Sequence, residues 1–159
     1  MKEISVLFVC LGNICRSPAG EGILRYLAER SGGFSKVDIM SCGTGSWHEG
    51  EFPDERMRKV AEKRGISLKS RARRFDPVFF DRFDYILAAD KKVLEDLRVE
   101  IRQEEDLRKI HLINDFNPDA RGEDVPDPYY GGDKGFEHVF DMLENACQGF
   151  LRNISETMK

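Results

Sequence analysis

The sequence predicts a single α/β domain in which a central four-stranded parallel sheet is covered by helices on both faces. Three observations lead to this prediction. Short apolar segments typical of buried strands alternate along the chain with segments that have a helical apolar periodicity. The 159 residues are about the length of one domain. No internal repeat, low-complexity tract or linker divides residues 1–159, so we expect one domain over this range.

The first strand and the first helix are predicted from their composition and end signals. Residues 4–9 are almost continuously apolar except for Ser5, as in a strand buried on both faces of a parallel sheet. A turn that contains glycine and asparagine follows. Ser17 is then expected to cap a helix, with Pro18 in its first position. Two glycines, beginning at Gly32, would end this helix.

The other elements continue the alternation of strands and helices. In chain order we expect a strand over residues 37–41, a helix from Pro53 to Gly65, a strand over 85–89, a helix from about Asp90, a strand over 109–113, a polar loop over 114–133 and a closing helix over 134–152. The inward face of the closing helix would hold Phe136, Val139, Phe140, Leu143 and Phe150. Ligands bind beyond the carboxyl ends of parallel strands, so the turn after the first strand is the first candidate site.

Composition and charge exclude several classes of protein. The net charge of −4 argues against a nucleic-acid-binding protein. No apolar run approaches the roughly 18 residues of a membrane span, and the N-terminus does not resemble a signal peptide, so we expect a cytoplasmic protein without membrane contact. The four cysteines and three histidines have no metal-ligand spacing. We therefore expect no metal and no other cofactor, in a monomer or a weakly self-associating protein.

The turn at residues 10–17 has the composition of an anion-binding site. Cys10 ends the first strand, and Arg16 and Ser17 begin the helix, whose free N–H groups and positive dipole end attract an anion. The planar guanidinium of Arg16 matches two phosphate oxygens. The same dipoles favour the thiolate of Cys10, and Ser17 can donate a hydrogen bond to it. This arrangement predicts transfer of a phosphoryl group to sulfur.

Two sequence motifs extend this interpretation to a known family. Residues 10–18 match the signature C-x-G-N-x-C-R-S-P near the N-terminus, and residues 127–131 read DPYYG just before the last helix. Weaker matches lie at residues 41–44, at Trp47 and at residues 85–87. The chain thus resembles the low-molecular-weight protein tyrosine phosphatase family from end to end. The resemblance implies the strand order 2-1-3-4, with a phosphate-binding loop after strand 1.

The resemblance also implies a reaction and the residues that perform it. The chain would hydrolyse phosphotyrosine and small aryl phosphate monoesters through a phosphocysteine intermediate, without a cofactor, and its partners would be phosphotyrosine-containing proteins. Cys10 would attack phosphorus and Arg16 would hold the phosphate. Asp127, which Pro126 and Pro128 bracket, would act as the general acid and then as the general base.

The remaining predicted site residues bind the substrate or support the loop. Substrate and phosphate would contact Leu11, Gly12, Asn13, Ile14, Cys15, Ser17, Trp47, Tyr129 and Tyr130. By the same resemblance, Ser41 and the side chain of Asn13 would hold the loop in its strained conformation. Cys15 would form a reversible disulfide with Cys10 that protects the nucleophile from over-oxidation.

The chain departs from the family pattern at a few positions. Ser70 stands where many members carry a histidine, Val93 stands where an asparagine would follow Asp90, and Cys42 replaces a common alanine. We expect these changes to alter the tuning of the site more than its chemistry. Residues 56–74 contain nine basic residues and one acidic residue, which could steer a phosphopeptide, although a solvated helix face and loop is the simpler interpretation.

Other functions remain open at this point. A protein-arginine phosphatase of the same family would carry a small polar residue in place of Ile14, where a branched apolar group favours a flat aromatic ring. An arsenate reductase would need further cysteines between Cys42 and Cys147, and there are none. A non-hydrolytic phosphotyrosine-binding or phosphocarrier module would not need Asp127. A thiol oxidoreductase would have no evident use for Arg16.

Overall fold

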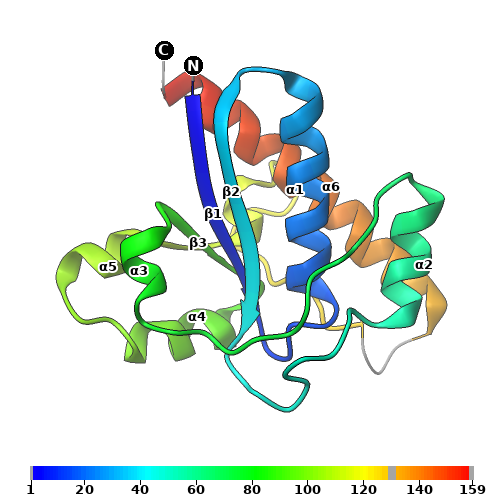
Figure 1. Ribbon diagram of the computed structural model, residues 1–159, viewed down its shortest axis with the longest axis horizontal. Helices are drawn as coiled ribbons and strands as arrows, with labels where there is room; N and C mark the ends of the chain where they lie inside the picture. The colour runs from blue at the N-terminus through cyan, green and yellow to red at the C-terminus, as the bar shows by residue number, and fades with distance from the viewer. Residues whose placement is uncertain (1, 129–131, 158–159) are drawn as a thin grey trace.

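Four parallel strands form the centre of the molecule (Figure 1). The computed structural model describes residues 2–128 and 132–157. The strands are β1 (Lys2–Cys10), β2 (Phe34–Gly43), β3 (Tyr85–Ala88) and β4 (Ile110–Leu112). They are arranged in the order β2-β1-β3-β4, and every pair is parallel. The predicted α/β class, the parallel sheet and the strand order are therefore confirmed.

The helices form two layers, one on each face of the sheet (Figure 1). One layer contains α1 (Arg16–Ser31), α2 (Glu55–Lys63) and α6 (Asp133–Thr157), and the other contains α3 (Phe79–Arg82), α4 (Lys91–Val99) and α5 (Glu104–Arg108). A 3₁₀ turn, η1 (Ile113–Phe116), follows β4. Alternate side chains of β1 enter the two cores: Val6 and Phe8 pack with the first layer, Leu7 and Val9 with the second. The continuous apolar run of β1 thus reflects burial on both faces.

The closing helix α6 is longer than predicted. The five side chains expected on its inward face, Phe136, Val139, Phe140, Leu143 and Phe150, are all buried. The helix starts one residue earlier than the predicted range 134–152 and continues to Thr157, because Ile154 adds another buried contact to the same core. Within the described part of the chain, no helix combines the length and apolar character needed to cross a membrane.

Several element boundaries differ from the prediction for identifiable reasons. β2 extends beyond residues 37–41 in both directions, since it is an edge strand whose exposed first residues pair only with β1. α2 does not start at Pro53: the carboxylate of Asp54 accepts the N–H of Arg56 and caps a helix that begins at Glu55. The short helices α3 and α5 were not predicted, because four or five residues cannot display an apolar period. The predicted loop over 114–133 begins inside η1.

The start of α1 also differs from the prediction. Ser17 is not the cap: Cys15 occupies the N-cap position and makes no side-chain capping bond, so Ser17 lies within the first turn. The Ser17 hydroxyl instead contacts the sulfur of Cys10. Because no side chain caps the helix, its first N–H groups remain available to an external acceptor.

Candidate active site

The loop between β1 and α1 lies at the carboxyl end of the sheet and is held by its neighbours. Cys10, the last residue of β1, is in register with Gly43 of β2, and the N–H of Thr44 donates to the Cys10 carbonyl at 2.9 Å. A side chain at Gly43 would come within 2.7 Å of the Leu11 carbonyl oxygen, so this position requires glycine. Asn13 has φ 58°, the left-handed conformation that asparagine adopts more easily than most residues. These constraints fix a tightly curled loop.

The sulfur of Cys10 receives hydrogen bonds from inside this loop. The N–H of Asn13 donates to Cys10 Sγ at 3.2 Å, and Ser17 Oγ lies 2.9 Å from the same sulfur. Ser17 Oγ also accepts from the Asn13 side-chain amide at 2.7 Å and can donate to the Cys42 carbonyl at 3.2 Å. Its single proton can point to the carbonyl when Cys10 is a thiol and to sulfur when it is a thiolate. Rotation of one hydroxyl thus accommodates both states.

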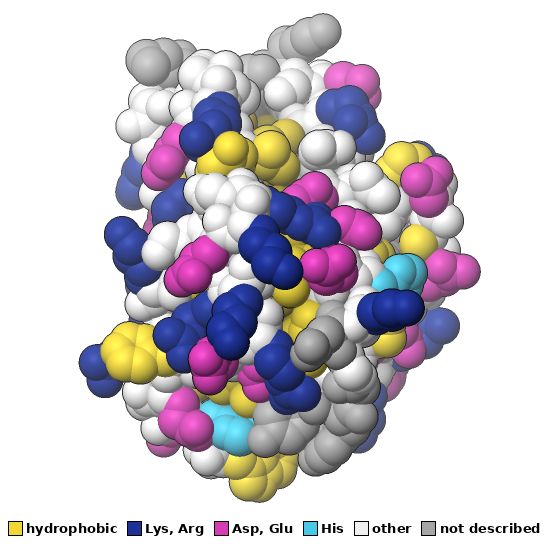
Figure 2. All heavy atoms as spheres, turned by 90° about the vertical axis from the view of Figure 1, so that its right-hand side faces the viewer, with side chains coloured by type: hydrophobic (Ala, Val, Ile, Leu, Met, Phe, Trp, Pro, Cys, Tyr) yellow, Lys and Arg dark blue, Asp and Glu magenta, His cyan; other side chains and the backbone are white. Residues whose placement is uncertain are grey.

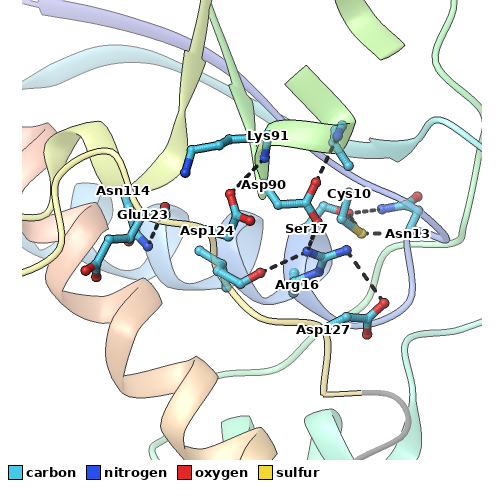
Figure 3. Close-up of polar contacts among 12 residues, drawn as sticks. Cys10, Asn13, Arg16, Ser17, Asp90, Lys91, Asn114, Glu123, Asp124 and Asp127 are labelled. Atoms are coloured by element: carbon cyan, nitrogen blue, oxygen red, sulfur yellow. Dashed lines mark hydrogen bonds and ion pairs between the residues drawn. The ribbon is translucent and has the colours of Figure 1, made fainter. Parts of the chain in front are cut away.

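The guanidinium of Arg16 is buried and anchored on one side (Figure 3). Its Nη1 donates to Asp90 Oδ2 at 2.6 Å and to the Val125 carbonyl at 2.9 Å. On the opposite side, Nη2 lies 3.6 Å from Asp127 Oδ2. Since both protons of Nη1 are engaged, Nε and Nη2 supply the donors that can face a bound phosphate.

The charge of Arg16 is secured by its neighbours. Burial opposes the charged form, but the nearby Cys10 and the hydrogen bond and charge of Asp90 outweigh it and raise the pKa of Arg16 above its ordinary value. Asp90 is itself fixed, because its carboxylate accepts the N–H of Val93 at 2.8 Å and caps α4. The cation is therefore permanent and its orientation is set by the start of α4.

Asp127 faces the same guanidinium from a more open position. It lies between Pro126 and Pro128 on the loop that precedes α6, and its side chain is 39% exposed. Figure 3 shows its carboxylate on the side of Arg16 that faces away from Asp90. The structure thus places the predicted acid beside the predicted phosphate-binding arginine.

A pocket of about 300 Å³ opens over the loop. The predicted residues that line it are Cys10, Leu11, Gly12, Ile14, Cys15, Arg16, Trp47 and Asp127. Ile14 is almost fully buried in the wall, whereas Trp47 is 72% exposed. Tyr129 and Tyr130, which the resemblance predicts to contact the substrate, lie outside the described residues. The size of the pocket suits one aromatic ring with a phosphate group.

The two supporting residues make different contacts. The Asn13 side-chain carbonyl accepts the N–H of Arg73 at 3.0 Å, which ties the loop to the segment before α3. The Ser41 hydroxyl donates to Glu21 Oε1 at 2.7 Å, and Glu21 also pairs with Arg25. The hydrogen bond of Ser41 therefore joins β2 to α1 and not to the phosphate-binding loop.

All four cysteines are free thiols and are buried. Burial, followed by the charges of Asp54 and Cys10, raises the pKa of the Cys15 thiol far above its ordinary value. Burial likewise raises the pKa of Cys42 and of Cys147. These three thiols are therefore protonated at neutral pH. Among the residues that the structure describes, no group of three or more His, Cys, Asp or Glu side chains could hold a metal ion.

Two site residues escaped the sequence analysis. Asp90 orients Arg16, and His48 lines the pocket, where a side chain at Gly12 would approach the imidazole to 3.0 Å. His48 Nδ1 lies 2.7 Å from Glu51 Oε2. For Asp90 a signal existed: it comes two residues after the end of β3, the neighbour of β1, so it had to lie at the same edge of the sheet. His48 has no motif of its own beyond its place next to Trp47.

Comparisons with known proteins agree with this geometry. The family model described as low molecular weight phosphotyrosine protein phosphatase matches residues 5–159. A low molecular weight protein-tyrosine-phosphatase of Streptomyces coelicolor is 42% identical over 156 residues, which cover 97% of this chain and 95% of that protein.

Solved structures give the same picture. A protein tyrosine phosphatase of Entamoeba histolytica, crystallised with Hepes in its active site, has a TM-score of 0.92 at 40% identity and covers 99% of this chain and 100% of its own. A Drosophila arginine phosphatase has a TM-score of 0.89 at 29% identity, with 95% of this chain and 98% of its own covered.

Proposed function

Because the chain belongs to the low molecular weight phosphotyrosine protein phosphatase family and is a cysteine-dependent protein tyrosine phosphatase, we propose that Cys10, Arg16 and Asp127 perform its reaction. One observation carries the proposal. The three side chains line a single pocket, and the sulfur at its base accepts the N–H of Asn13 inside a loop that begins a helix. This is the arrangement that binding a phosphate dianion against a nucleophile requires.

In the first step the Cys10 thiolate attacks phosphorus. A sulfur–phosphorus bond forms and the bond to the tyrosine oxygen breaks, while Asp127 gives its proton to the departing oxygen. The loop N–H groups and the free donors of Arg16 bind the three equatorial oxygens as charge develops on them. Asp90 takes no part in the bond changes, since it only holds Arg16 in place.

In the second step water hydrolyses the phosphocysteine. Asp127, now a carboxylate, removes a proton from the water as its oxygen attacks phosphorus, and the electron pair of the breaking bond returns to sulfur. Inorganic phosphate leaves and Cys10 is again a thiolate. The Ser17 hydroxyl, 2.9 Å from the sulfur, can donate to this leaving thiolate.

Phosphotyrosine is the substrate that the walls of the pocket favour. Ile14, Leu11 and Trp47 surround the opening with apolar surface, on which an aromatic ring packs well. A guanidinium would place part of its N–H surface against the same apolar atoms, which accept no hydrogen bonds. Discrimination of this kind amounts to a few kcal/mol, so a slow reaction with phosphoarginine is compatible with it.

The test is phosphate release from a phosphotyrosine peptide and a phosphoarginine peptide in parallel, without added metal, with Cys10→Ser as the control. We expect release from phosphotyrosine that the variant loses by at least about a thousandfold. A preference for phosphoarginine would keep the mechanism and overturn the substrate. Undiminished release by the variant would overturn Cys10 as the nucleophile.

We also propose that Cys15 protects Cys10 from irreversible oxidation. Peroxide would oxidise the Cys10 thiolate to a sulfenic acid, and the Cys15 thiol would then attack that sulfur, releasing water as the disulfide forms. Both residues line the same pocket, and burial keeps Cys15 a thiol until that attack. Mass spectrometry after peroxide treatment should find the Cys10–Cys15 link. Sulfinic acid at Cys10 without any link would contradict the proposal.

The setting proposed for the enzyme is the cytoplasm, where it would act on phosphotyrosine-containing proteins as a monomer or a weakly self-associating protein. Four free thiols suit a reducing compartment. Sedimentation at two protein concentrations and fractionation of cells test the two parts of this proposal separately.

A further inference from the structure

The segment between α2 and α3 presents a row of cations to solvent. Burial alternates along it as in an extended chain. The inward side chains are Ile66, Leu68 and Ala72, all buried. The alternate side chains Lys69, Arg71 and Arg73 are exposed and together are called the basic track here. At about 6.5–7 Å per two residues, their spacing matches alternate side chains of an extended peptide.

The basic track differs from most cations of α2 because its side chains form no ion pair within the described residues. Among the α2 cations this is also true of Arg58, which donates to the Pro53 carbonyl. Lys59 and Lys63 of α2 and the following Arg64 each pair with a carboxylate. Within residues 2–128 and 132–157, no carboxylate forms an ion pair with any residue of the basic track. Figure 2, which views the α2 side of the molecule, shows Lys and Arg side chains gathered on this face with acidic side chains between them. The track thus supplies positive charge that no carboxylate of the described residues neutralises by an ion pair.

The basic track starts at the phosphate-binding loop. The backbone N–H of Arg73 donates to the side-chain carbonyl of Asn13. The backbone N–H of Asn13 in turn donates to the sulfur of Cys10. Ala72 exchanges two backbone hydrogen bonds with the neighbouring loop: it donates to the Glu51 carbonyl and accepts from the N–H of Gly50. The segment is therefore held beside the wall of the pocket, and Figure 1 shows it crossing in front of α1 toward the carboxyl end of β2.

A second hollow adjoins the first pocket and approaches the basic track at Phe52. This cavity of about 410 Å³ shares Ile14 and His48 with the first pocket, and the rest of its lining is Glu51, Phe52, Pro53, Asp54, Glu55 and Arg58. The ring of Phe52 is half exposed, and the guanidinium of Arg71 stacks 4.3 Å from its centroid. Arg71 is therefore the residue of the basic track that lies beside the hollow.

We propose that the basic track binds acidic side chains of the phosphoprotein substrate, within a few residues of the phosphotyrosine. The inference rests on the proposed phosphotyrosine activity and adds the sequence context of its substrates. Charge complementarity argues for this partner, since no carboxylate of the described residues pairs with the three cations and the basic track is a local positive surface on a chain of net charge −4. Three carboxylates that line the hollow act against it, Glu51, Asp54 and Glu55, although Asp54 pairs with Arg56 and Glu55 with Lys59. The exposed Glu49 also acts against it.

The experiment compares two phosphotyrosine peptides that differ only in having glutamate or glutamine at alternate positions, on each side of the phosphotyrosine in turn. The measured quantity is the ratio of kcat/KM for the two peptides within each variant, so that changes in the chemical step cancel. We expect the native enzyme to prefer the glutamate peptide on one side by about tenfold at low salt. The preference should shrink at 0.2 M salt, because exposed charges are screened over about 10 Å.

Matched variants locate the effect. The triple change Lys69→Gln, Arg71→Gln, Arg73→Gln should bring the ratio close to one. The triple change Lys59→Gln, Lys63→Gln, Arg108→Gln removes the same charge from side chains about 70% exposed elsewhere and should leave the ratio unchanged. Glu49→Gln should raise the ratio.

The possible results separate the two proposals. Equal rates for both peptides in the native enzyme would overturn the docking inference while leaving the phosphatase activity intact. An equal fall in both triple variants would also overturn it, because net charge alone would then explain the preference. Hydrolysis of neither phosphotyrosine peptide, with hydrolysis of phosphoarginine, would overturn the proposed substrate itself.

Discussion

Two carboxylates approach Arg16 from two different regions of the molecule. Asp90, at the start of α4, is 20% exposed, contacts Nη1 at 2.6 Å and also caps its helix. Asp127, on the loop before α6, is 39% exposed and lies 3.6 Å from Nη2. Both residues are aspartates that face Arg16, but the Asp90 contact is short and largely buried, whereas the Asp127 contact is longer and more exposed to solvent.

This difference separates a structural task from a chemical one. A carboxylate that accepts hydrogen bonds from a guanidinium and from a backbone N–H is held in one orientation. A carboxylate with a long contact and solvent access can exchange a proton with a substrate or a water molecule. We therefore assign Asp90 to the orientation of Arg16 and Asp127 to proton transfer. Each assignment predicts a different kinetic signature.

The largest effect is expected for Asp127→Asn. Loss of the general acid should lower kcat/KM for phosphotyrosine, which reports the first step and not the hydrolysis of phosphocysteine, by about 10²–10⁴-fold, because the tyrosine oxygen then leaves without a proton. The loss should be much smaller for 4-nitrophenyl phosphate, whose leaving group needs no protonation. Steady-state kinetics with both substrates measure the difference, and inhibition by vanadate should persist. Equal losses for the two substrates would contradict the role of acid.

A smaller and different effect is expected for Asp90→Asn. The amide can still cap α4, but it withdraws the charge that holds Arg16, so kcat/KM should fall by about tenfold to a hundredfold. The loss should be the same for both leaving groups, and vanadate should bind more weakly. Asp124→Asn is the matched control, since Asp124 accepts the neighbouring N–H of Lys91 without contacting Arg16. If the loss in kcat/KM for Asp90→Asn depended on the leaving group, Asp90 and Asp127 could not be assigned different roles.

The same comparison explains what the sequence could predict. The residues of the loop at 10–17 are contiguous in sequence, so its chemistry could be predicted from one stretch of chain. The same holds for the apolar run of β1. Asp90 reaches Arg16 across 74 residues of sequence, through the pairing of β3 with β1. Its role depends on that register, which residue type alone does not encode.

Backbone groups and short elements were beyond prediction for another reason. The Val125 carbonyl that binds Arg16 is a group every residue carries, so nothing in the sequence marks it. The Ser17 hydroxyl fitted the pattern of a helix cap, but a buried sulfur at 2.9 Å competes for it. The exposed first residues of β2 lack an apolar pattern because only one neighbour strand pairs with them.

A still smaller effect is expected for a substitution of Trp47, on the exposed side of the pocket. Trp47→Ala should lower kcat/KM for aryl phosphates by about threefold to tenfold, because the ring stacking that it offers is lost at an exposed position. Alkyl phosphates should be affected less. Val99, at the end of α4, is a control because its apolar side chain is also exposed. Val99→Ala should leave kcat/KM unchanged for both aryl and alkyl phosphates. A uniform loss for aryl and alkyl substrates would instead assign Trp47 to the support of the loop.

The smallest effect on activity is expected for a change at His111, at the opposite end of the sheet. It tests whether the pH dependence of the site is set by residues near the site alone. His111 of β4 packs against Tyr85 and Phe116, and burial, only partly offset by the charge of Asp115, lowers the pKa of His111. In the unfolded chain this histidine takes up a proton at about pH 6.5, whereas in the folded chain it resists protonation. The contribution of His111 to the free energy of unfolding should therefore be fully present above that pH and should be lost as the pH falls below it.

Urea unfolding at pH 7.5, 6.5 and 5.5 measures this decline. His111→Gln should flatten it, whereas His138→Gln, a change at an exposed residue of α6, should leave it intact. The acid side of the kcat/KM profile should be the same in native enzyme and His111→Gln, because His111 shares a hollow with Glu3, Ser5 and Asp84 at the amino ends of the strands. A shifted activity profile would show that the two ends of the sheet are coupled and that the tuning of the site is not local.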